Sequence, residues 1–139
     1  MHAFDPTENL VRTWGEAQLG DATVRLNLGV DTGCSQTILV GSAITTLTYN
    51  TGLGDPLRVV TAGGDITGYK LKLDRLSALS QDGFSYDVLV CDLPSSLGVD
   101  GLLGLDFYWG KHLHLDFENG FVDLEDPTWP ASKGPAHNP

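Results

Sequence analysis

Basic residues are scarce in this chain. Eight Lys and Arg stand against 18 Asp and Glu among 139 residues, which gives a net charge of −10. Such an acidic surface repels nucleic-acid phosphates and anionic membranes, so we expect neither as a partner. No apolar run approaches the roughly 20 residues that a membrane-spanning helix needs, and residues 1–6 have neither the basic start nor the apolar stretch of a signal peptide. These absences predict a soluble, cytoplasmic protein.

Cysteine is also rare. Cys34 and Cys91 are the only two, and neither belongs to a Cys-x-x-Cys pair of the kind that binds metals. In a cytoplasmic protein we expect both to be reduced thiols. With 41% hydrophobic residues, the chain can form one compact core but is too short for a second full domain.

Short apolar runs dominate what is present. Seventeen glycines and seven prolines are spread among them, and this punctuation favours many short strands over long helices. Alternating side chains predict strands over residues 10–17 and 22–30, joined by a turn at 18–21. A β-branched run predicts another strand over residues 37–40, and a helical turn is expected over 43–47.

A second hairpin is predicted over residues 57–73. Its tip consists of Ala62, Gly63, Gly64 and Asp65, whose glycines supply the backbone conformations of a tight turn. Further strands are expected over residues 75–79, 86–91, 111–117 and 121–124.

Together these elements predict a mostly β, single domain over residues 10–124 with one or two short helices. Asp106 is expected to open one of these helices and to cap its first amides. An N-terminal arm (residues 1–9) precedes the domain, and a flexible tail (residues 125–139) with little apolar content follows it.

One tripeptide places polar chemistry at the end of an apolar strand. Asp31, Thr32 and Gly33 follow directly on Val30, and another strand comes after them. Asp, Thr and Gly are all common turn residues, so the tripeptide alone is weak evidence. Its apolar flanks are stronger evidence, because burying a carboxylate is costly unless another group pairs with it or a reaction uses it.

Three segments, in this order, resemble the retropepsin-like aspartic proteases, the dimeric relatives of pepsin. Residues 28–35 (LGVDTGCS) look like the catalytic loop of that family. Residues 59–68 (VVTAGGDITG) are similar to the flap hairpin that closes over substrate, and residues 101–107 (GLLGLDF) to the second glycine loop and its helix. The resemblance implies a closed β-barrel that is half of an acid protease and pairs about a two-fold axis.

The resemblance makes Asp31 the catalytic acid-base. Acid proteolysis needs two carboxylates that share one proton and works best in mild acid. The chain has a single Asp-Thr-Gly, so the second carboxylate would come from Asp31 of a twin chain. The implied reaction is hydrolysis of peptide bonds, and it requires no cofactor and no metal.

The resemblance also implies roles for the neighbouring residues. Gly33 would let the backbone approach the carboxylates, and Thr32 would hydrogen-bond across the dimer interface. Ser35 would be a hydrogen-bond partner of Asp31. The flap tip, residues 62–65, would offer backbone groups to an extended peptide or an unfolded protein.

Two positions depart from the family pattern. Cys34 stands where alanine is more common, which puts a thiol beside the catalytic residues. Leu105 stands where retroviral members carry an arginine that supports their dimer. The alternative function is therefore a catalytically inactive domain of the same fold that serves as a dimerisation or peptide-binding module.

A third possibility is a metal-dependent hydrolase. His112, His114 and Asp116 alternate along one strand, so their side chains project from one face and are plausible metal ligands. A flat strand is a poor chelator of one ion. We therefore favour the interpretation of these residues as a solvated face opposite an apolar face formed by Leu113, Leu115 and Phe117.

Overall fold

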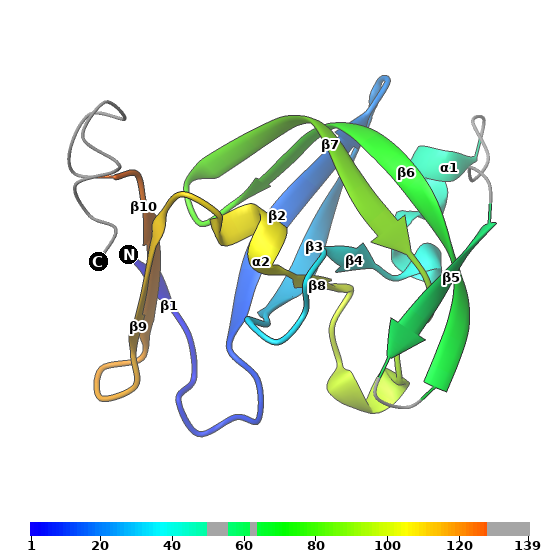
Figure 1. The fold of residues 1–139 in the computed structure, drawn as a ribbon. Helices are drawn as coiled ribbons and strands as arrows, with labels where there is room; N and C mark the ends of the chain where they lie inside the picture. The colour runs from blue at the N-terminus through cyan, green and yellow to red at the C-terminus, as the bar shows by residue number, and fades with distance from the viewer. Residues whose placement is uncertain (50–55, 62–63, 128–139) are drawn as a thin grey trace.

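Six strands of the computed structural model close into a β-barrel (Figure 1). The structure describes residues 1–49, 56–61 and 64–127, with the backbone alone for 56–61 and 64–67. The order around the barrel is β2 (Arg12–Leu19), β3 (Ala22–Val30), β8 (Gly101–Leu103), β4 (Ile38–Leu39), β7 (Gln81–Val90) and β6 (Gly64–Ala78). Pairing of β6 with β2 closes the ring. The described residues thus confirm the predicted mostly β fold with a closed barrel.

The first hairpin, β2 and β3, forms one wall of the barrel and delivers the chain to residue 31. Side chains of β2 alternate strictly, with Ala17 buried and Trp14 exposed. Gly15 faces inward, where there is no room for a side chain. A Cβ there would lie 2.7 Å from both Leu28 Cδ1 and the Ser77 carbonyl oxygen. The predicted hairpin is confirmed, but its turn is shorter than expected, because β2 continues to Leu19.

A long strand, β6, replaces two that the sequence predicts separately. Residues 66–73 and 75–78 belong to one strand of 15 residues, which pairs first with β5 (Pro56–Thr61) and later with β2, while Leu79, the last residue of the second predicted strand, lies in the following turn. The error has a physical cause: the buried face changes from Leu71 and Leu73 to Leu76 and Ala78, so the alternation breaks where the strand bends around the barrel.

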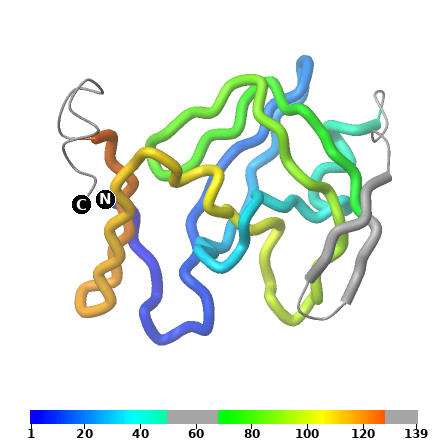
Figure 2. The backbone as a smooth tube through the Cα atoms, in the orientation of Figure 1, coloured from blue at the N-terminus to red at the C-terminus, as the bar shows by residue number. Residues whose placement is uncertain are grey.

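A small second sheet carries both ends of the described chain. Its order is β1 (His2–Ala3), β10 (Phe121–Glu125) and β9 (His112–Asp116), all antiparallel. The N-terminal arm therefore pairs with the last strand, and Figure 2 shows both at one side of the barrel. The β9–β10 hairpin confirms the predicted Asn-Gly turn, and the predicted tail beyond residue 127 is outside the described residues.

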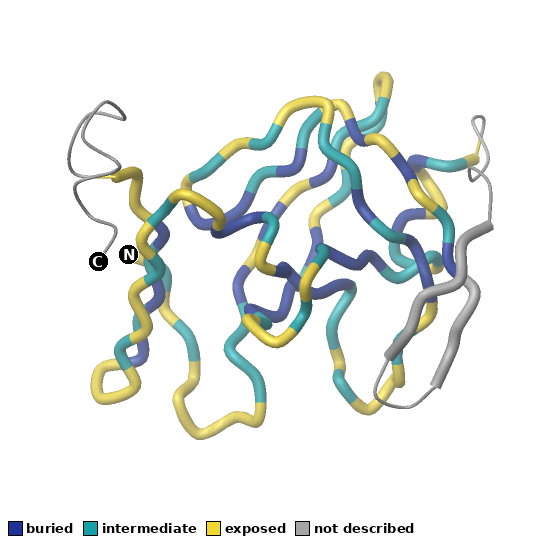
Figure 3. The backbone as a smooth tube through the Cα atoms, in the orientation of Figure 1, coloured by how far each residue is buried: buried dark blue, intermediate teal, exposed yellow. Residues whose placement is uncertain are grey.

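Helices are few and short in the described part of the chain. They are η1 (Gly41–Ile44), α1 (Thr45–Thr48), η2 (Ser95–Leu97) and α2 (Leu105–Tyr108). The first pair confirms the predicted helical turn. None of the described helices has the length and apolar character needed to span a membrane. The buried core residues come mainly from the barrel strands, and Figure 3 colours the buried segments dark blue.

Candidate active site

Asp31 lies where β3 ends beside β8. These two strands run parallel, and their last pair joins Val30 to Leu103. The Asp31 amide extends the pairing by donating to the Leu103 carbonyl over 3.1 Å. The side chain is half-buried at this point. An apolar strand in the barrel wall thus ends in a carboxylate that solvent can reach.

The loop after Asp31 is a tight turn built around that carboxylate. The Gly33 amide donates to Asp31 Oδ1 over 2.9 Å, and the Cys34 amide donates to the Asp31 carbonyl over 3.2 Å. A Cβ on Gly33 would lie 3.2 Å from Asp31 Oδ1, so glycine permits the close approach. Thr32 and Gly33 are exposed beside the carboxylate.

The second glycine segment packs against the back of this loop. The Leu105 amide donates to the Cys34 carbonyl over 2.8 Å. At Gly104 a Cβ would lie 2.6 Å from the backbone carbon of Gln36 and 2.8 Å from the carbonyl oxygen of Cys34. Two motifs about 70 residues apart in sequence are therefore in direct backbone contact, and the contact requires glycine.

Asp106 does not cap its helix. The N-cap of α2 is Gly104, with no side-chain cap bond. The Asp106 carboxylate instead accepts hydrogen bonds at Oδ1 from the Thr37 amide (2.8 Å) and hydroxyl (2.9 Å), and at Oδ2 from the Tyr86 hydroxyl (2.6 Å). The Thr37 oxygen in turn accepts from the Gly104 amide over 3.1 Å. The predicted capping role is wrong because tertiary donors compete for the carboxylate.

Sequence reasoning missed Thr37, Tyr86 and Tyr108 at this site. Tyr86 is on β7 and reaches Asp106 across the barrel end, while Tyr108 on α2 donates to the Leu103 carbonyl over 2.8 Å. No local pattern marks these residues, because each partner is set by how the strands close. Only the polar Thr37, within an apolar strand start, offers a signal in the sequence.

The phenols of two tyrosines near Asp31, Tyr86 and Tyr108, have raised pKa values. Burial raises the pKa of the Tyr108 phenol, and the charges of Asp31 and Asp106 raise it further. Burial also raises the pKa of the Tyr86 phenol, as does its hydrogen bond to Asp106. Both hydroxyls therefore remain donors at neutral pH.

Cys34 sits in the same electrostatic environment. Burial raises the pKa of its thiol, the hydrogen bond to the Gln36 carbonyl (2.9 Å) opposes this, and the charges of Asp31 and Asp106 add to the increase. Cys34 and Cys91 are free thiols. A thiol with a raised pKa stays protonated and is a poor nucleophile, which leaves Asp31 as the candidate reactive group.

Two further predicted site features are Ser35 and the flap hairpin. Ser35 is exposed, and within the described residues it makes no hydrogen bond to Asp31. Gly64 and Asp65 begin β6 and pair with Thr61 and Val60 of β5, so the predicted flap is a hairpin. Its tip residues Ala62 and Gly63 lie outside the described residues.

The histidines of β9 do not assemble a metal site. His112 and His114 are exposed, with ring centroids 6.4 Å apart, and His114 Nε2 lies 3.5 Å from the Glu125 carboxylate. The third predicted ligand, Asp116, accepts its hydrogen bonds from the following turn. In the described ranges no group of three or more His, Cys, Asp or Glu is arranged to hold an ion.

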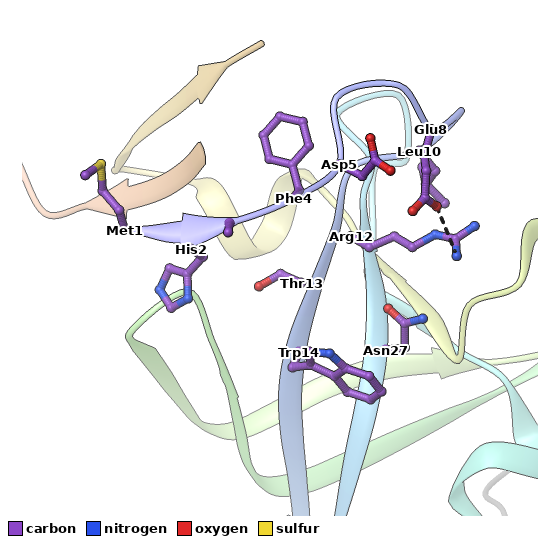
Figure 4. A pocket seen from close by; sticks show the side chains of 11 residues that line it. Met1, His2, Phe4, Asp5, Glu8, Leu10, Arg12, Thr13, Trp14 and Asn27 are labelled. Atoms are coloured by element: carbon purple, nitrogen blue, oxygen red, sulfur yellow. Dashed lines mark ion pairs between the residues drawn. The ribbon is translucent and has the colours of Figure 1, made fainter. Parts of the chain in front are cut away.

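One pocket of the described residues is separate from Asp31. It has a volume of about 550 Å³ and lies between the N-terminal arm, the start of β2 and the later half of β3 (Figure 4). Arg12, Trp14 and Asn27 line it, and the Arg25 guanidinium stacks 4.0 Å from the Trp14 ring centre. Asp31 is not among its lining residues, so a single chain does not enclose the carboxylate in this cavity.

Comparison with known proteins agrees with the geometry. A model of the aspartyl protease family matches residues 16–107. A search of the curated proteins found no match. The matched segment contains the Asp31 loop, the β5–β6 hairpin, β8 and the start of α2, which is more than half of the chain. The chain therefore belongs to the aspartyl protease family.

Proposed function

We propose that this protein is an aspartic endopeptidase whose catalytic dyad consists of two Asp31 carboxylates, one from each subunit of a homodimer. The observation that carries the proposal is the loop at Asp31: an accessible carboxylate at the end of a buried parallel strand pair, with exposed Thr32 and Gly33 beside it. The chain has one Asp-Thr-Gly. A second copy is the simplest source of the second carboxylate.

The chemistry follows from two carboxylates that share a proton. The ionised carboxylate takes a proton from a bound water as the water oxygen attacks the peptide carbonyl carbon. The protonated carboxyl gives its proton to the carbonyl oxygen, so a neutral tetrahedral diol forms. The dyad then gives its proton to the leaving nitrogen, and the other carboxylate takes a proton from a diol hydroxyl as the C–N bond breaks. The products are a carboxylic acid and an amine, and the dyad again holds one proton.

The surroundings of Asp31 suit a peptide substrate. The β5–β6 hairpin is the flap in this proposal, and its backbone would pair with an extended chain by strand addition. Figure 1 shows the end of β5 and the start of β6 at the lower edge of the molecule, towards which the loop after β3 also points. Unfolded proteins and extended peptides are therefore the proposed substrate class.

Acid conditions favour this enzyme for two reasons. Like charges held close together cannot both ionise cheaply, so the dyad keeps its shared proton in mild acid. In addition, each chain brings a net charge of −10, and protonation of surface carboxylates weakens the repulsion between the two copies. We expect tighter dimers and faster cleavage at roughly pH 4 to 6. Sedimentation that finds only monomers across that range contradicts the proposal.

The decisive experiment measures cleavage of denatured casein from roughly pH 3 to 7, with and without pepstatin, by the wild type and Asp31→Asn. The proposal expects acid-peaked cleavage that Asp31→Asn and pepstatin abolish.

Mixing equal amounts of wild-type and Asp31→Asn chains adds a test of the shared dyad. Random pairing with inactive mixed dimers lowers the activity to about half that of the same wild-type chains alone, whereas a monomeric enzyme keeps it unchanged.

The inactive binding module remains the second candidate, because of one feature beside the loop. Leu105 and Trp109 at the two ends of α2 are 49% and 88% exposed, so apolar surface occupies a place where an ion pair would support a retroviral-type dimer. A folded dimer that binds extended peptides but cleaves none at any pH supports this candidate. Chelator-sensitive, pepstatin-resistant cleavage instead supports the metal hydrolase.

A further inference from the structure

Asp106 connects three segments that meet behind the catalytic loop. Its two carboxylate oxygens accept three hydrogen bonds of 2.6 to 2.9 Å, from Thr37 on the loop side and from Tyr86 on β7. Bonds to an ionised acceptor are stronger than neutral ones, and partial burial strengthens them further. Asp106 is also the residue next to Leu105, whose amide holds Cys34.

We propose that Asp106 is a positioning residue for peptide hydrolysis, which fixes the loop carrying Asp31 through its hydrogen bonds to Thr37. The inference rests on the proposed function, since it assigns Asp106 a part in that reaction. Asp106 touches neither substrate nor the reacting atoms in this assignment.

The loop is held at three points, and Asp106 supplies the last. Asp31 is tied to Leu103 at the start, Cys34 to Leu105 in the middle, and Thr37 to Asp106 at the end. Thr37 is fully buried, so its hydroxyl has no water to replace a lost partner. Catalytic geometry tolerates little error, and a displacement of about 1 Å can cost a hundredfold in rate.

The carboxylate itself is held from the opposite side by Tyr86. The Tyr86 ring packs edge-on against Phe107, with ring centroids 5.9 Å apart. The ring also covers Gly83, where an added Cβ would overlap it. The tyrosine hydroxyl therefore cannot follow a shifted carboxylate, and the clamp has one preferred position.

The test combines isosteric and truncating substitutions. Thr37→Val keeps the buried shape but removes the hydroxyl, and Asp106→Ala removes the acceptor. Thr37→Ser restores the hydroxyl, while Asp106→Asn keeps Oδ1 for Thr37 and turns Nδ2 towards the Tyr86 oxygen. If Asp106→Ala does not fold, Tyr86→Phe tests the same hydrogen-bond network by removing the hydroxyl that donates to Asp106.

Asp116→Ala is the matched control. The Asp116 carboxylate also accepts three hydrogen bonds, from Glu118 and Asn119, but it lies in the β9–β10 turn. Its loss removes the same charge and the same number of bonds from a region that does not contact the catalytic loop.

We expect Thr37→Val and Asp106→Ala to lower kcat for a peptide at least about tenfold, with KM within about twofold. Thr37→Ser and Asp106→Asn should recover kcat to within about threefold of the wild-type value. Asp116→Ala should also keep kcat within about threefold of that value. Hydrogen exchange of the Asp31 and Leu105 amides should quicken in the first two variants only.

Folded Thr37→Val and Asp106→Ala proteins with wild-type kcat overturn the proposal, whatever their thermal stability. Failure of the proposed function is distinguishable, because the wild type then cleaves nothing. In that case the exchange rates alone decide: faster exchange at Asp31 and Leu105 supports the loop-holding role, and unchanged exchange overturns it.

Discussion

Two aspartates of this molecule each accept three hydrogen bonds, but their donors come from different distances along the chain. Asp116 receives its bonds from Glu118 and Asn119, two and three residues away. Asp106 receives its bonds from Thr37 and Tyr86, which are 69 and 20 residues away. The β9–β10 turn is therefore a local structure, and the loop carrying Asp31 is held by a tertiary one.

The difference shows how each region responds to change. The hydrogen bonds of a local turn form between residues that are close in sequence. A substitution there should therefore affect only the hairpin and the N-terminal arm. The Asp31 loop is held in place only when β3, β7, β8 and α2 are packed together. A substitution that displaces any one of these elements should also displace the Asp31 carboxylate, and the following substitutions test that contrast.

The largest effect is expected from Asp31→Asn. Asparagine fits the same turn, but it can neither share the proton of the dyad nor accept one from water. Cleavage should fall by at least about a hundredfold, while the melting temperature stays close to that of the wild type. Initial rates and thermal unfolding measure the two quantities, and a variant that still cleaves at the wild-type rate would falsify the assignment of Asp31.

Gly104→Ala should have the next largest effect and should damage both stability and activity. Its Cβ meets backbone atoms of Gln36 and Cys34 at 2.6 and 2.8 Å. We expect a loss of about 1–3 kcal/mol in unfolding free energy, the usual cost of overpacking, together with lower kcat. Denaturant unfolding and peptide cleavage are the measurements.

Gly120→Ala provides the comparison from the other region. Gly120 has a φ of 73°, and a Cβ there would lie 2.5 Å from the Phe4 carbonyl oxygen. This substitution should destabilise the turn and the arm but leave kcat unchanged. Equal losses of kcat in the two alanine variants would remove the distinction between the regions.

A smaller effect is expected from Tyr86→Phe. The ring and its contact with Phe107 remain, and only the hydroxyl bond to Asp106 is lost. A hydrogen bond to a charged group contributes about 1.5–3 kcal/mol, and water entering at the half-buried carboxylate should offset part of this. Chemical denaturation should show the loss, and kcat should fall a few fold. An unchanged protein would mean that Thr37 alone holds Asp106.

The smallest effect is expected from Asp116→Ala and should depend on pH. The hydrogen bonds from Asn119 lower the pKa of Asp116 in the folded protein. Its stabilising contribution is therefore complete above the ordinary carboxyl pKa of about 3.9 and is lost as the pH falls through the lowered value. Asp116→Ala should melt below the wild type at neutral pH, and the difference in melting temperature should shrink as the pH falls below about 3.9. A difference that widens in acid would contradict this sign.

Local patterns predicted a large part of the fold. Alternation predicted the β2–β3 hairpin, Asn119-Gly120 predicted the β9–β10 turn, and the helical turn expected over residues 43–47 lies in η1 and α1. The turn at Leu79 and Ser80 was missed, because two non-glycine residues with φ of 53° and 62° carry no turn signal in their identity.

The sequence by itself determined the candidate catalytic carboxylate and its immediate setting. Asp31, Thr32 and Gly33 after an apolar strand predict a turn that presents a carboxylate, since strand, turn and hydrogen bond all lie within a few residues. Only the tertiary structure decided what holds that turn in place. Asp106, Thr37 and Tyr86 meet because a parallel β3–β8 pair and the closure of the barrel bring distant segments together. These contacts join residues that are far apart in sequence, so no local pattern predicts them and only the folded structure shows them.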